Sequence, residues 1–430
     1  MFEVELPLPG SSGDIKRIGQ VNGSAAGYII NQAAQKTDGV TVVVTNDSDS
    51  ANRLQQEVSF YQQQTTLEIL SYPDWETLPY DSFSPHQDII SERIHTLHRL
   101  PLVKQGILIV PVSTLMHRTP PPAFVSGHAL ILKTGQTLDP GRLRSQLSEA
   151  GYHAVDTVYE HGEFAIRGSI IDIYPMGSPL PYRIDLFDDE VDTLRSFDPE
   201  NQRSIETLKE IKLLPAREFP LHQQAVTGFK QRWRELFDVD YRKCPIYQDI
   251  DSGLTPPGIE YYMPLFFDQC ATLLDYLPSD SLIICDQGLE GAAENFWRDV
   301  LIRYEDYRYD IERPILEPAS VFLPLEQLFS SLKQTRRLIL SEAQIEKKAG
   351  RQNLNCSIPA DLSVNSQADN PYERLQTYLA SAQLPVLLCA ESAGRREALL
   401  ELLQKISIKA TAFDDWQSFT ESPEKLGITT

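Results

Sequence analysis

The chain has 430 residues, and at about 100–200 residues per domain we expect two to four domains rather than one core. Its formal net charge of −21 argues against general nucleic-acid binding, which depends on lysine and arginine contacts to phosphates, and favours a basic protein partner. With no run of about 20 apolar residues and an acidic start, "MFEVELPLPG", the sequence excludes a membrane-spanning helix and a secretory leader. We therefore expect a cytoplasmic protein without a membrane partner.

Residues 1–125 read as α/β, the first part of a degenerate P-loop-like domain. "GVTVVVT" (39–45) is predicted to be a buried strand followed by a helix, and "GILIVPVSTLM" (106–116) a second buried strand. Another helix is predicted from about Gln87. Strands that alternate with helices imply a parallel sheet, whose carboxyl ends would hold any ligand.

The stretch "RIGQVNGSAAGYII" (17–30) lies where a nucleotide-binding loop would be expected. In the template G-x-x-x-x-G-K-[ST], the register that starts at Gln20 places Ala26 at the lysine and Gly27 at the Ser/Thr. No register restores the lysine that neutralises the phosphates. From these residues alone, a small-residue turn before a helix is the simpler interpretation.

The predicted strand "SLIICDQGLE" (281–290) lies where helicase-type nucleotide hydrolases have a second motif, a strand that ends in Asp-Glu. Asp286 occupies the position of the Mg²⁺-binding carboxylate, but Gln287 replaces the glutamate that polarises water, and a carboxamide is no general base. We expect no catalytic residue, no metal and no cofactor in this chain. The degenerate nucleotide loop, not expected to bind, comprises Gly23, Ala26, Gly27, Asp286 and Gln287.

Residues 126–214 follow a proline run and contain short strands and one helix, "GRLRSQLSEAGY". In "YRIDLFDDE", strict alternation directs Arg183 and Phe187 to the solvated face. In "EHGEFAIRG", it directs Phe164 and Ile166 inward and Ala165 and Arg167 outward. If the two strands are neighbours, Arg167, Arg183 and Phe187 form one outward cluster, and arginines with aromatics are typical of binding hot spots.

Residues 215–350 are predicted to mix helices, strands and many loops, with a helix at 289–307. Residues 351–430 are predicted to form a small α/β domain that the sequence does not complete. A polar stretch at 347–371 is predicted to be a linker. The cysteines lack zinc-site spacing and are expected to be reduced, buried thiols. They are Cys244, Cys270, Cys285, Cys356 and Cys389.

The segment "DWETLPYDSFSP" carries Trp75, Tyr80 and Phe83, which could stack on a base. It has no interleaved lysine or arginine, so packing is the favoured interpretation. The nearby His95 and His98 lie one helical turn apart without a third ligand, which argues against a metal site.

Long strings of the sequence resemble the N-terminal part of the bacterial transcription-repair coupling factors, the Mfd family. They are "DWETLPYDSFSPHQDIISERIHTLHRLP", "LIVPVSTLMHR" and "EHGEFAIRGSIIDIYPMGSPLPYRIDLFDDE". Segments 167–206 and 258–286 are also similar to the repair protein UvrB, the first of them to the domain that docks onto UvrA. The resemblance covers the whole chain and implies a UvrB-like module with a degenerate RecA/P-loop-type parallel sheet, an inserted small α+β UvrA-binding domain and a small C-terminal α/β domain.

The resemblance implies an adaptor that recruits UvrA, with Arg167, Arg183 and Phe187 at the family positions that contact it. It also implies that the ATP- and Mg²⁺-dependent DNA translocase that displaces RNA polymerase lies beyond residue 430, as do the regions that bind RNA polymerase and DNA. An intramolecular contact with the C-terminal part is expected to mask the docking face. The alternative is a residual nucleotide- or DNA-binding module, although Pro85 leads directly into a helix and leaves no room for the DNA-clamping hairpin of UvrB.

Overall fold

The computed structural model describes residues 5–62, 67–354, 356–358, 360–365 and 367–430. The chain forms two compact units, Met1–Cys356 and Ser357–Thr430, which are described separately. The predicted divisions at 125/126 and 214/215 inside the first unit remain predictions.

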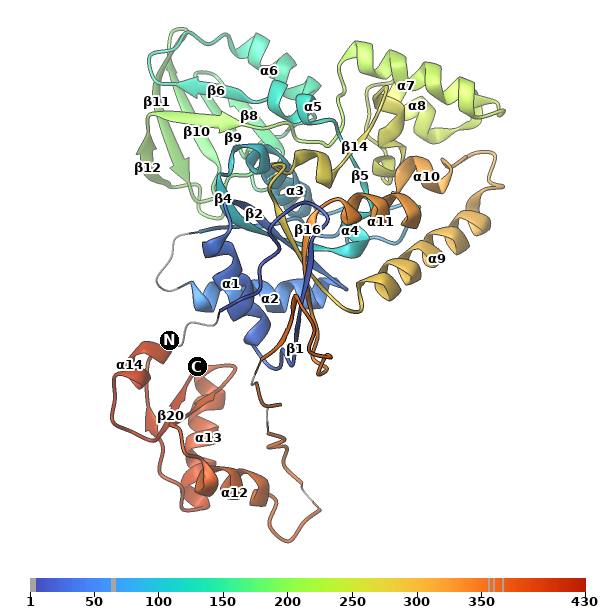
Figure 1. The fold of residues 1–430 in the computed structure, drawn as a ribbon. Coiled ribbons are helices and arrows are strands. Elements are labelled where there is room, and N and C mark those ends of the chain that lie inside the picture. The colour runs from blue at the N-terminus through green and yellow to red at the C-terminus, as the bar shows by residue number, and fades with distance from the viewer. Residues whose placement is uncertain (1–4, 63–66, 355, 359, 366) are drawn as a thin grey trace. The chain divides into compact units, whose positions relative to one another are not determined.

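A parallel sheet forms the base of the first unit (Figure 1). In the described part of the chain it has seven strands in the order β17-β1-β16-β15-β2-β4-β3. The predicted strand at 39–45 is confirmed as β2, and the strand that was expected at 106–116 ends at Pro111, where a short helix, α4, begins. The strands are β1 (Ile15–Gly19), β2 (Gly39–Thr45), β3 (Glu68–Ser71), β4 (Gln105–Pro111), β15 (Leu282–Asp286), β16 (Arg336–Leu340) and β17 (Arg351–Asn353).

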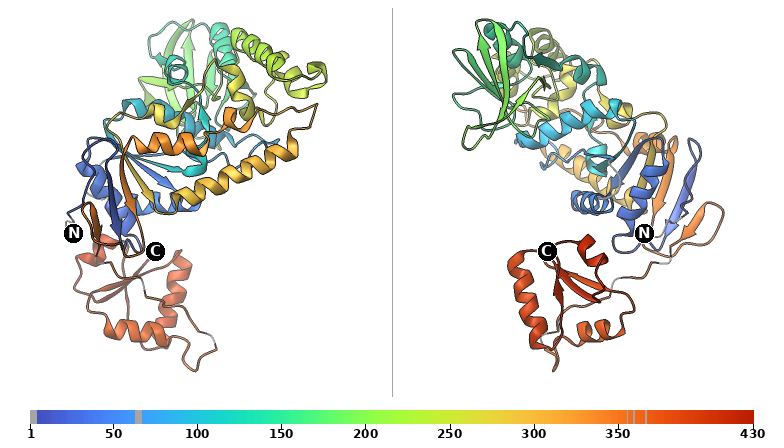
Figure 2. Two further views of the ribbon diagram at one scale, coloured as in Figure 1. Left: turned by 45° about the vertical axis from the view of Figure 1, so that its right-hand side comes forward. Right: turned by 90° about the vertical axis from the view of Figure 1, so that its left-hand side faces the viewer.

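Helices cover both faces of this sheet because the adjacent strands β2, β4 and β15 carry apolar side chains on both sides. On one face, Ile29 and Ile30 of α1 and Val58 of α2 pack with Val43 and Ile284. The opposite face packs against the other helices (Figures 1 and 2). These helices are α1 (Ala25–Lys36) and α2 (Ser48–Tyr61) on the first face, and α4 (Val112–Leu115), α9 (Leu289–Tyr307) and α11 (Leu325–Lys333) on the second.

A second sheet has six strands in the described chain, in the order β12-β11-β10-β9-β8-β7. All pairs are antiparallel except β7 with β8. The condition that the two strands carrying Arg167 and Arg183 are neighbours is not met, because β9 lies between β8 and β10. The strands are β7 (His153–Ala154), β8 (Glu163–Arg167), β9 (Ile170–Ile173), β10 (Tyr182–Phe187), β11 (Glu190–Phe197) and β12 (Ser204–Leu208).

One large core joins the inner face of this sheet to the helices around it. Ile171 and Ile184 of the sheet belong to the same buried cluster as Ile90 and Ile94 of α3 and Leu143 of α6. The six-stranded sheet is therefore held by a core shared with the rest of the unit, which restrains its orientation. The elements that close this core are α3 (Gln87–Arg99), α6 (Pro140–Glu149), α7 (Gln223–Leu236), α8 (Pro245–Asp251), η3 (Ile259–Phe266) and the pair β6 (Leu130–Lys133) with β13 (Glu210–Leu213).

The aromatic loop before α3 packs into the core at Trp75 and Tyr80, as predicted, but not at Phe83. Trp75 and Tyr80 are 2% and 1% exposed, whereas Phe83 is 68% exposed. The helix starts at Gln87, with the ring of His86 accepting a hydrogen bond from the Asp88 backbone N–H. The remaining elements of the unit are η1 (Leu100–Leu102), β5 (Arg118–Thr119), α5 (Pro122–Gly127), η2 (Tyr241–Lys243), β14 (Ala271–Thr272), η4 (Leu273–Tyr276) and α10 (Pro318–Val321).

The predicted linker at 347–371 is partly wrong, because Arg351–Asn353 forms β17 and pairs in parallel with β1. Beyond it, the described residues of the second unit form a small parallel sheet in the order β18-β20-β19 and three helices. Its elements are α12 (Glu373–Ser381), β18 (Val386–Cys389), α13 (Ala393–Lys405), β19 (Thr411–Ala412), α14 (Trp416–Thr420) and β20 (Leu426–Thr429).

The five cysteines are free, and Cys389 is exposed, so the expectation of burial is wrong there. Cys270 and Cys356 are half-buried, while Cys244 and Cys285 are buried. Within the described ranges, no helix has both the length and the apolar character needed to span a bilayer.

Candidate functional site

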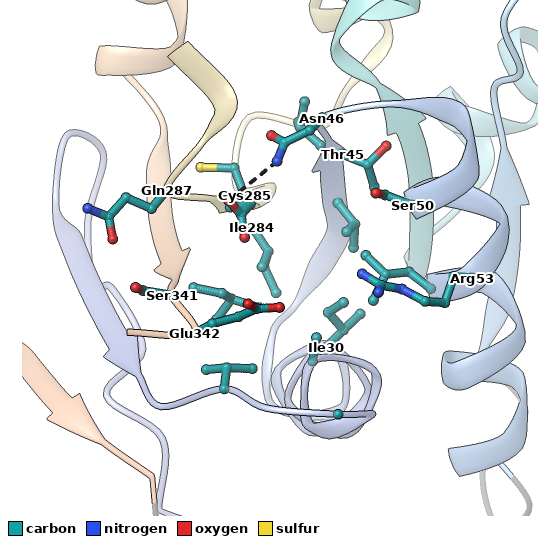
Figure 3. A pocket seen from close by; sticks show the side chains of 18 of the residues that line it. Ile30, Thr45, Asn46, Ser50, Arg53, Ile284, Cys285, Gln287, Ser341 and Glu342 are labelled. Atoms are coloured by element: carbon teal, nitrogen blue, oxygen red, sulfur yellow. Dashed lines mark hydrogen bonds between the residues drawn. The ribbon is translucent and has the colours of Figure 1, made fainter. Parts of the chain in front are cut away.

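The positions of a nucleotide site meet at the carboxyl ends of the parallel strands. A cavity of about 450 Å³ lies there, lined by Gly23 and Ala26 at the start of α1 and by Asp286 and Gln287 at the end of β15. Figure 3 shows this cavity with Asn46, Arg53 and Glu342 around it. The methyl group of Ala26 thus stands where the loop template has a lysine.

Gly27 is not among the residues that line this cavity; it packs against α2. A Cβ atom placed on Gly27 would lie 2.5 Å from Cβ of Glu57, so glycine allows the two helices to approach closely. The backbone N–H of Gly27 donates to Oε2 of Glu57 at 3.3 Å. Burial raises the pKa of this carboxyl group. The Glu57 side chain therefore accepts a hydrogen bond from a backbone N–H at the N-terminus of α1. In nucleotide sites, N–H groups of this kind bind phosphate.

Asp286 is engaged locally at the end of β15. Its Oδ1 accepts hydrogen bonds from the backbone N–H of Gly288 at 2.7 Å and from Nδ2 of Asn46 at 3.4 Å. The backbone N–H of Gln287 donates to the carbonyl of Leu340 at 3.0 Å. These contacts fix the turn into α9 and engage Oδ1 of the carboxylate that the template assigns to a metal ion.

The second candidate site is the outer face of the six-stranded sheet, the face turned away from the shared core. The strand register aligns Ala165, Asp172, Arg183 and Arg195 across β8, β9, β10 and β11. The sequence predicted an outward Ala165, but this residue is 2% exposed. It is covered in a small apolar cluster on the outer face, together with Val158, Tyr174 and Phe197.

Asp172 connects the two arginines that the sequence singled out. Its Oδ1 accepts from Nε of Arg183 at 2.7 Å and its Oδ2 from Nη2 of Arg183 at 2.9 Å. The same Oδ2 accepts from Nη2 of Arg167. Asp172 is fully buried, and the ion pair raises the pKa of Arg183. The structure therefore brings Arg167 and Arg183 together through a carboxylate on the strand between them.

The two arginines differ in exposure. The side chain of Arg167 is 46% exposed, whereas that of Arg183 is 17% exposed. The guanidinium of Arg183 lies 4.7 Å from the centre of the Phe197 ring, a cation–π distance. Arg183 is largely enclosed, and Arg167 presents more of its surface to solvent.

Phe187 ends β10 and is 74% exposed. Alternation along β10 places it on the same face as Arg183, with Asp185 between them. Asp185 accepts from the Thr193 hydroxyl at 2.8 Å and from Nη2 of Arg195. The aromatic ring thus stands at the strand end, beyond a second arginine–carboxylate pair.

Sequence reasoning missed Asp172 and Arg195. The signal for Asp172 was present, since a lone carboxylate interrupts the apolar run "SIIDIYP" and a buried charge requires a partner. That partner is recognisable only when the register is known. Arg195 lies on β11, a strand that the sequence prediction did not include.

Comparisons with known proteins place these features in a family. The model described as "UvrB interaction domain" matches residues 130–219, and the model described as "MFD, D3 domain" matches residues 378–430. The chain is 44% identical over 402 residues, 93% of its length, to the transcription-repair-coupling factor of Escherichia coli (strain K12), and covers 35% of that protein.

Other relatives agree. The chain is 39% identical over 94% of its length to the transcription-repair-coupling factor of Haemophilus influenzae, of which it covers 35%. It is 30% identical over 62% of its length to that of Bacillus subtilis, of which it covers 24%. The chain thus spans about a third of the length of the first two relatives, and the resemblance found in the sequence is confirmed. The chain belongs to the transcription-repair-coupling factor family, of which it represents a region with a UvrB interaction domain and a D3 domain.

Proposed function

We propose that this chain is an adaptor region of transcription-coupled nucleotide excision repair, and that it recruits UvrA through the outer face of the six-stranded sheet. The observation that carries the proposal is the position of Arg167, Arg183 and Phe187 on one face within the UvrB interaction domain match at 130–219. Arginine and aromatic side chains dominate binding hot spots because they give much contact for little ordering entropy.

The proposed adaptor works by mimicry. A surface shared with UvrB lets a coupling factor engage the same partner, and one partner site cannot hold both proteins at once. In the whole protein, we propose that this region acts in the cytoplasm, joined to an ATP-dependent DNA translocase that displaces RNA polymerase. Contacts with polymerase and DNA belong to parts outside these 430 residues, and the C-terminal part of the whole protein masks the docking face by an intramolecular contact.

The test is a calorimetric titration of the chain with purified UvrA at two salt concentrations, repeated with UvrB present. We expect saturable binding, weaker at the higher salt because arginines contribute, and displacement by UvrB because the surface is shared. Binding that UvrB leaves unchanged would contradict the mimicry. Absence of binding by the natural chain would overturn the proposal.

We further propose that the chain is not itself an ATPase. Ala26 supplies no charge for a triphosphate, and the Glu57 carboxylate accepts from the Gly27 N–H at the start of α1. Millimolar ATP with Mg²⁺ is therefore expected to leave the thermal unfolding midpoint unchanged. The alternative, a residual nucleotide-binding module, predicts about 2.7 kcal/mol of stabilisation when ATP is at a hundred times its Kd. A P-loop ATPase in the same buffer serves as the positive control.

A further inference from the structure

We infer that Asp172 is a positioning residue that holds Arg167 and Arg183 as one preformed docking unit. The inference rests on the proposed function and assigns a task to a residue that itself does not face solvent. Asp172 is fully buried on β9, between the strands that carry the two arginines. It therefore acts through its neighbours rather than by touching a partner.

The geometry around Asp172 fixes both guanidinium groups. Arg183 uses Nε and Nη2 on the two carboxylate oxygens, at 2.7 and 2.9 Å, which is a bidentate pair. Arg167 donates from Nη2 to the same carboxylate and from Nη1 to the carbonyl of Asp156 at 2.8 Å. Each arginine is thus held at more than one nitrogen before any partner arrives.

The network also ties down the loops beside the face. Nη1 of Arg183 donates to the carbonyl of Gln202 at 3.2 Å, and Nε2 of Gln202 donates to the carbonyl of Val158 at 3.1 Å. Asp156 and Val158 lie in the loop before β8, and Gln202 lies in the loop before β12. The series of hydrogen bonds from Asp172 through Arg183 to Gln202 therefore links both loops to the centre of the sheet.

Charge and entropy explain why such a device favours docking. A long arginine side chain carries about 2 kcal/mol of rotamer entropy, and a residue that is already ordered does not lose it again on binding. The side chain of Arg183 is only 17% exposed, so it mainly completes the hydrogen-bond network around Asp172. The more exposed Arg167 and Phe187 contact the partner. The buried carboxylate sets the position of both cations.

The test replaces Asp172 by asparagine, which keeps the shape and removes the charge. We expect UvrA binding to be about tenfold weaker, a smaller loss than truncation of a hot-spot residue causes, because the variant disorders the two arginines without removing them. The control is Asp299→Asn, which makes the same change in net charge at an exposed carboxylate on α9. This variant should bind UvrA as the natural chain does. Equal affinity of Asp172→Asn and the natural chain would overturn the inference.

Double-mutant cycles separate positioning from general structural damage. The effect of Asp172→Asn should be largely lost in an Arg167→Ala background, because the two residues form one network, and should be kept in a Phe187→Ala background, since Phe187 lies at the far end of β10. Equal losses in both backgrounds would show a general structural role and overturn the inference.

A measurement on the chain alone, without UvrA, tests directly whether Asp172 orders Arg183. By NMR, the Nε–H proton of Arg183 should exchange slowly with water in the natural chain and at least tenfold faster in Asp172→Asn. If the natural chain fails to bind UvrA, the proposed function fails, and this exchange measurement still decides whether Asp172 orders the arginine. Unchanged exchange in the variant would overturn the inference.

Discussion

Replacement of Arg93 by alanine is expected to lower the free energy of unfolding by about 3–5 kcal/mol, because it leaves a buried carboxylate without its partner. The side chains of Arg93 and Glu218 are 0% and 2% exposed, and Nε of Arg93 lies 2.9 Å from Oε1 of Glu218. Arg93 also donates to the hydroxyl of Tyr72 at 2.8 Å and to the carbonyl of Pro73 at 2.9 Å. The truncation therefore removes one cation and strands several buried acceptors.

Loss of the Arg93–Glu218 ion pair should also affect the segment that matches the UvrB interaction domain, because the pair lies at the end of that segment. Arg93 lies on α3, whereas Glu218 lies at the end of the 130–219 segment that matches the UvrB interaction domain. The pair thus fastens the returning end of that segment to α3 and to the chain after β3. We expect the variant to unfold at lower urea concentration with the docking domain loosened.

Urea unfolding followed by circular dichroism measures the effect, and Arg99→Ala is the matched control on the same helix. Arg99 pairs with Glu68 at 2.6 Å, but their side chains are 36% and 34% exposed. A pair of this exposure contributes about 0–1 kcal/mol, so its loss should be small. Equal destabilisation by the two substitutions would contradict the assignment of the Arg93 pair as a major stabilising contact.

Three adjacent strands of the parallel sheet, β2, β4 and β15, were predictable because each is a short, mainly apolar run, as is typical of a strand buried on both faces. The strands β1, β3 and β16 were not predicted, because charged residues interrupt their short sequences. Arg351–Asn353 gave no such signal: its residues are polar, and they form a strand only through backbone pairing with β1. An edge strand of this kind depends on a partner more than 300 residues away, which no local pattern reveals.

The site was predictable only in part, for a similar reason. Alternation within β10 correctly placed Arg183 on the outer face and left Phe187 exposed. Alternation could not tell that β9 lies between β8 and β10, so the role of Asp172 was hidden. Ala165 lies on the predicted outer face but is buried there, because that face carries its own small apolar cluster, and alternation identifies a face without showing what covers it.

The combined variant Arg167→Ala/Arg183→Ala/Phe187→Ala is expected to abolish UvrA binding. Each side chain is of a type whose truncation at a hot spot costs about 2 kcal/mol or more, and the three together exceed what a moderate affinity survives. Such values are not additive for residues in one network, so the combined loss for Arg167 and Arg183 should be smaller than the sum of their separate losses. The measurement is the same calorimetric titration, with circular dichroism to establish that the variant remains folded.

The single substitutions should separate contact from support. Phe187 is 74% exposed, so Phe187→Ala should lower affinity about thirtyfold while changing the free energy of unfolding by no more than about 0.5 kcal/mol. Arg183→Ala should lower both, because it removes the bidentate partner of the buried Asp172 carboxylate. Leu236→Ala, which removes an exposed apolar side chain from the end of α7, outside the 130–219 segment, is the control and should change neither quantity appreciably.

These expectations fail in distinguishable ways. If Phe187→Ala binds UvrA as the natural chain does, the ring is an ordinary exposed side chain and the contact surface lies elsewhere on the domain. If Arg183→Ala loses affinity without losing stability, its guanidinium meets the partner directly, and its enclosure against Phe197 opens on binding. Loss of both quantities with Arg183→Ala, and of affinity alone with Phe187→Ala, is the pattern required when a buried carboxylate supports a surface that an aromatic side chain completes.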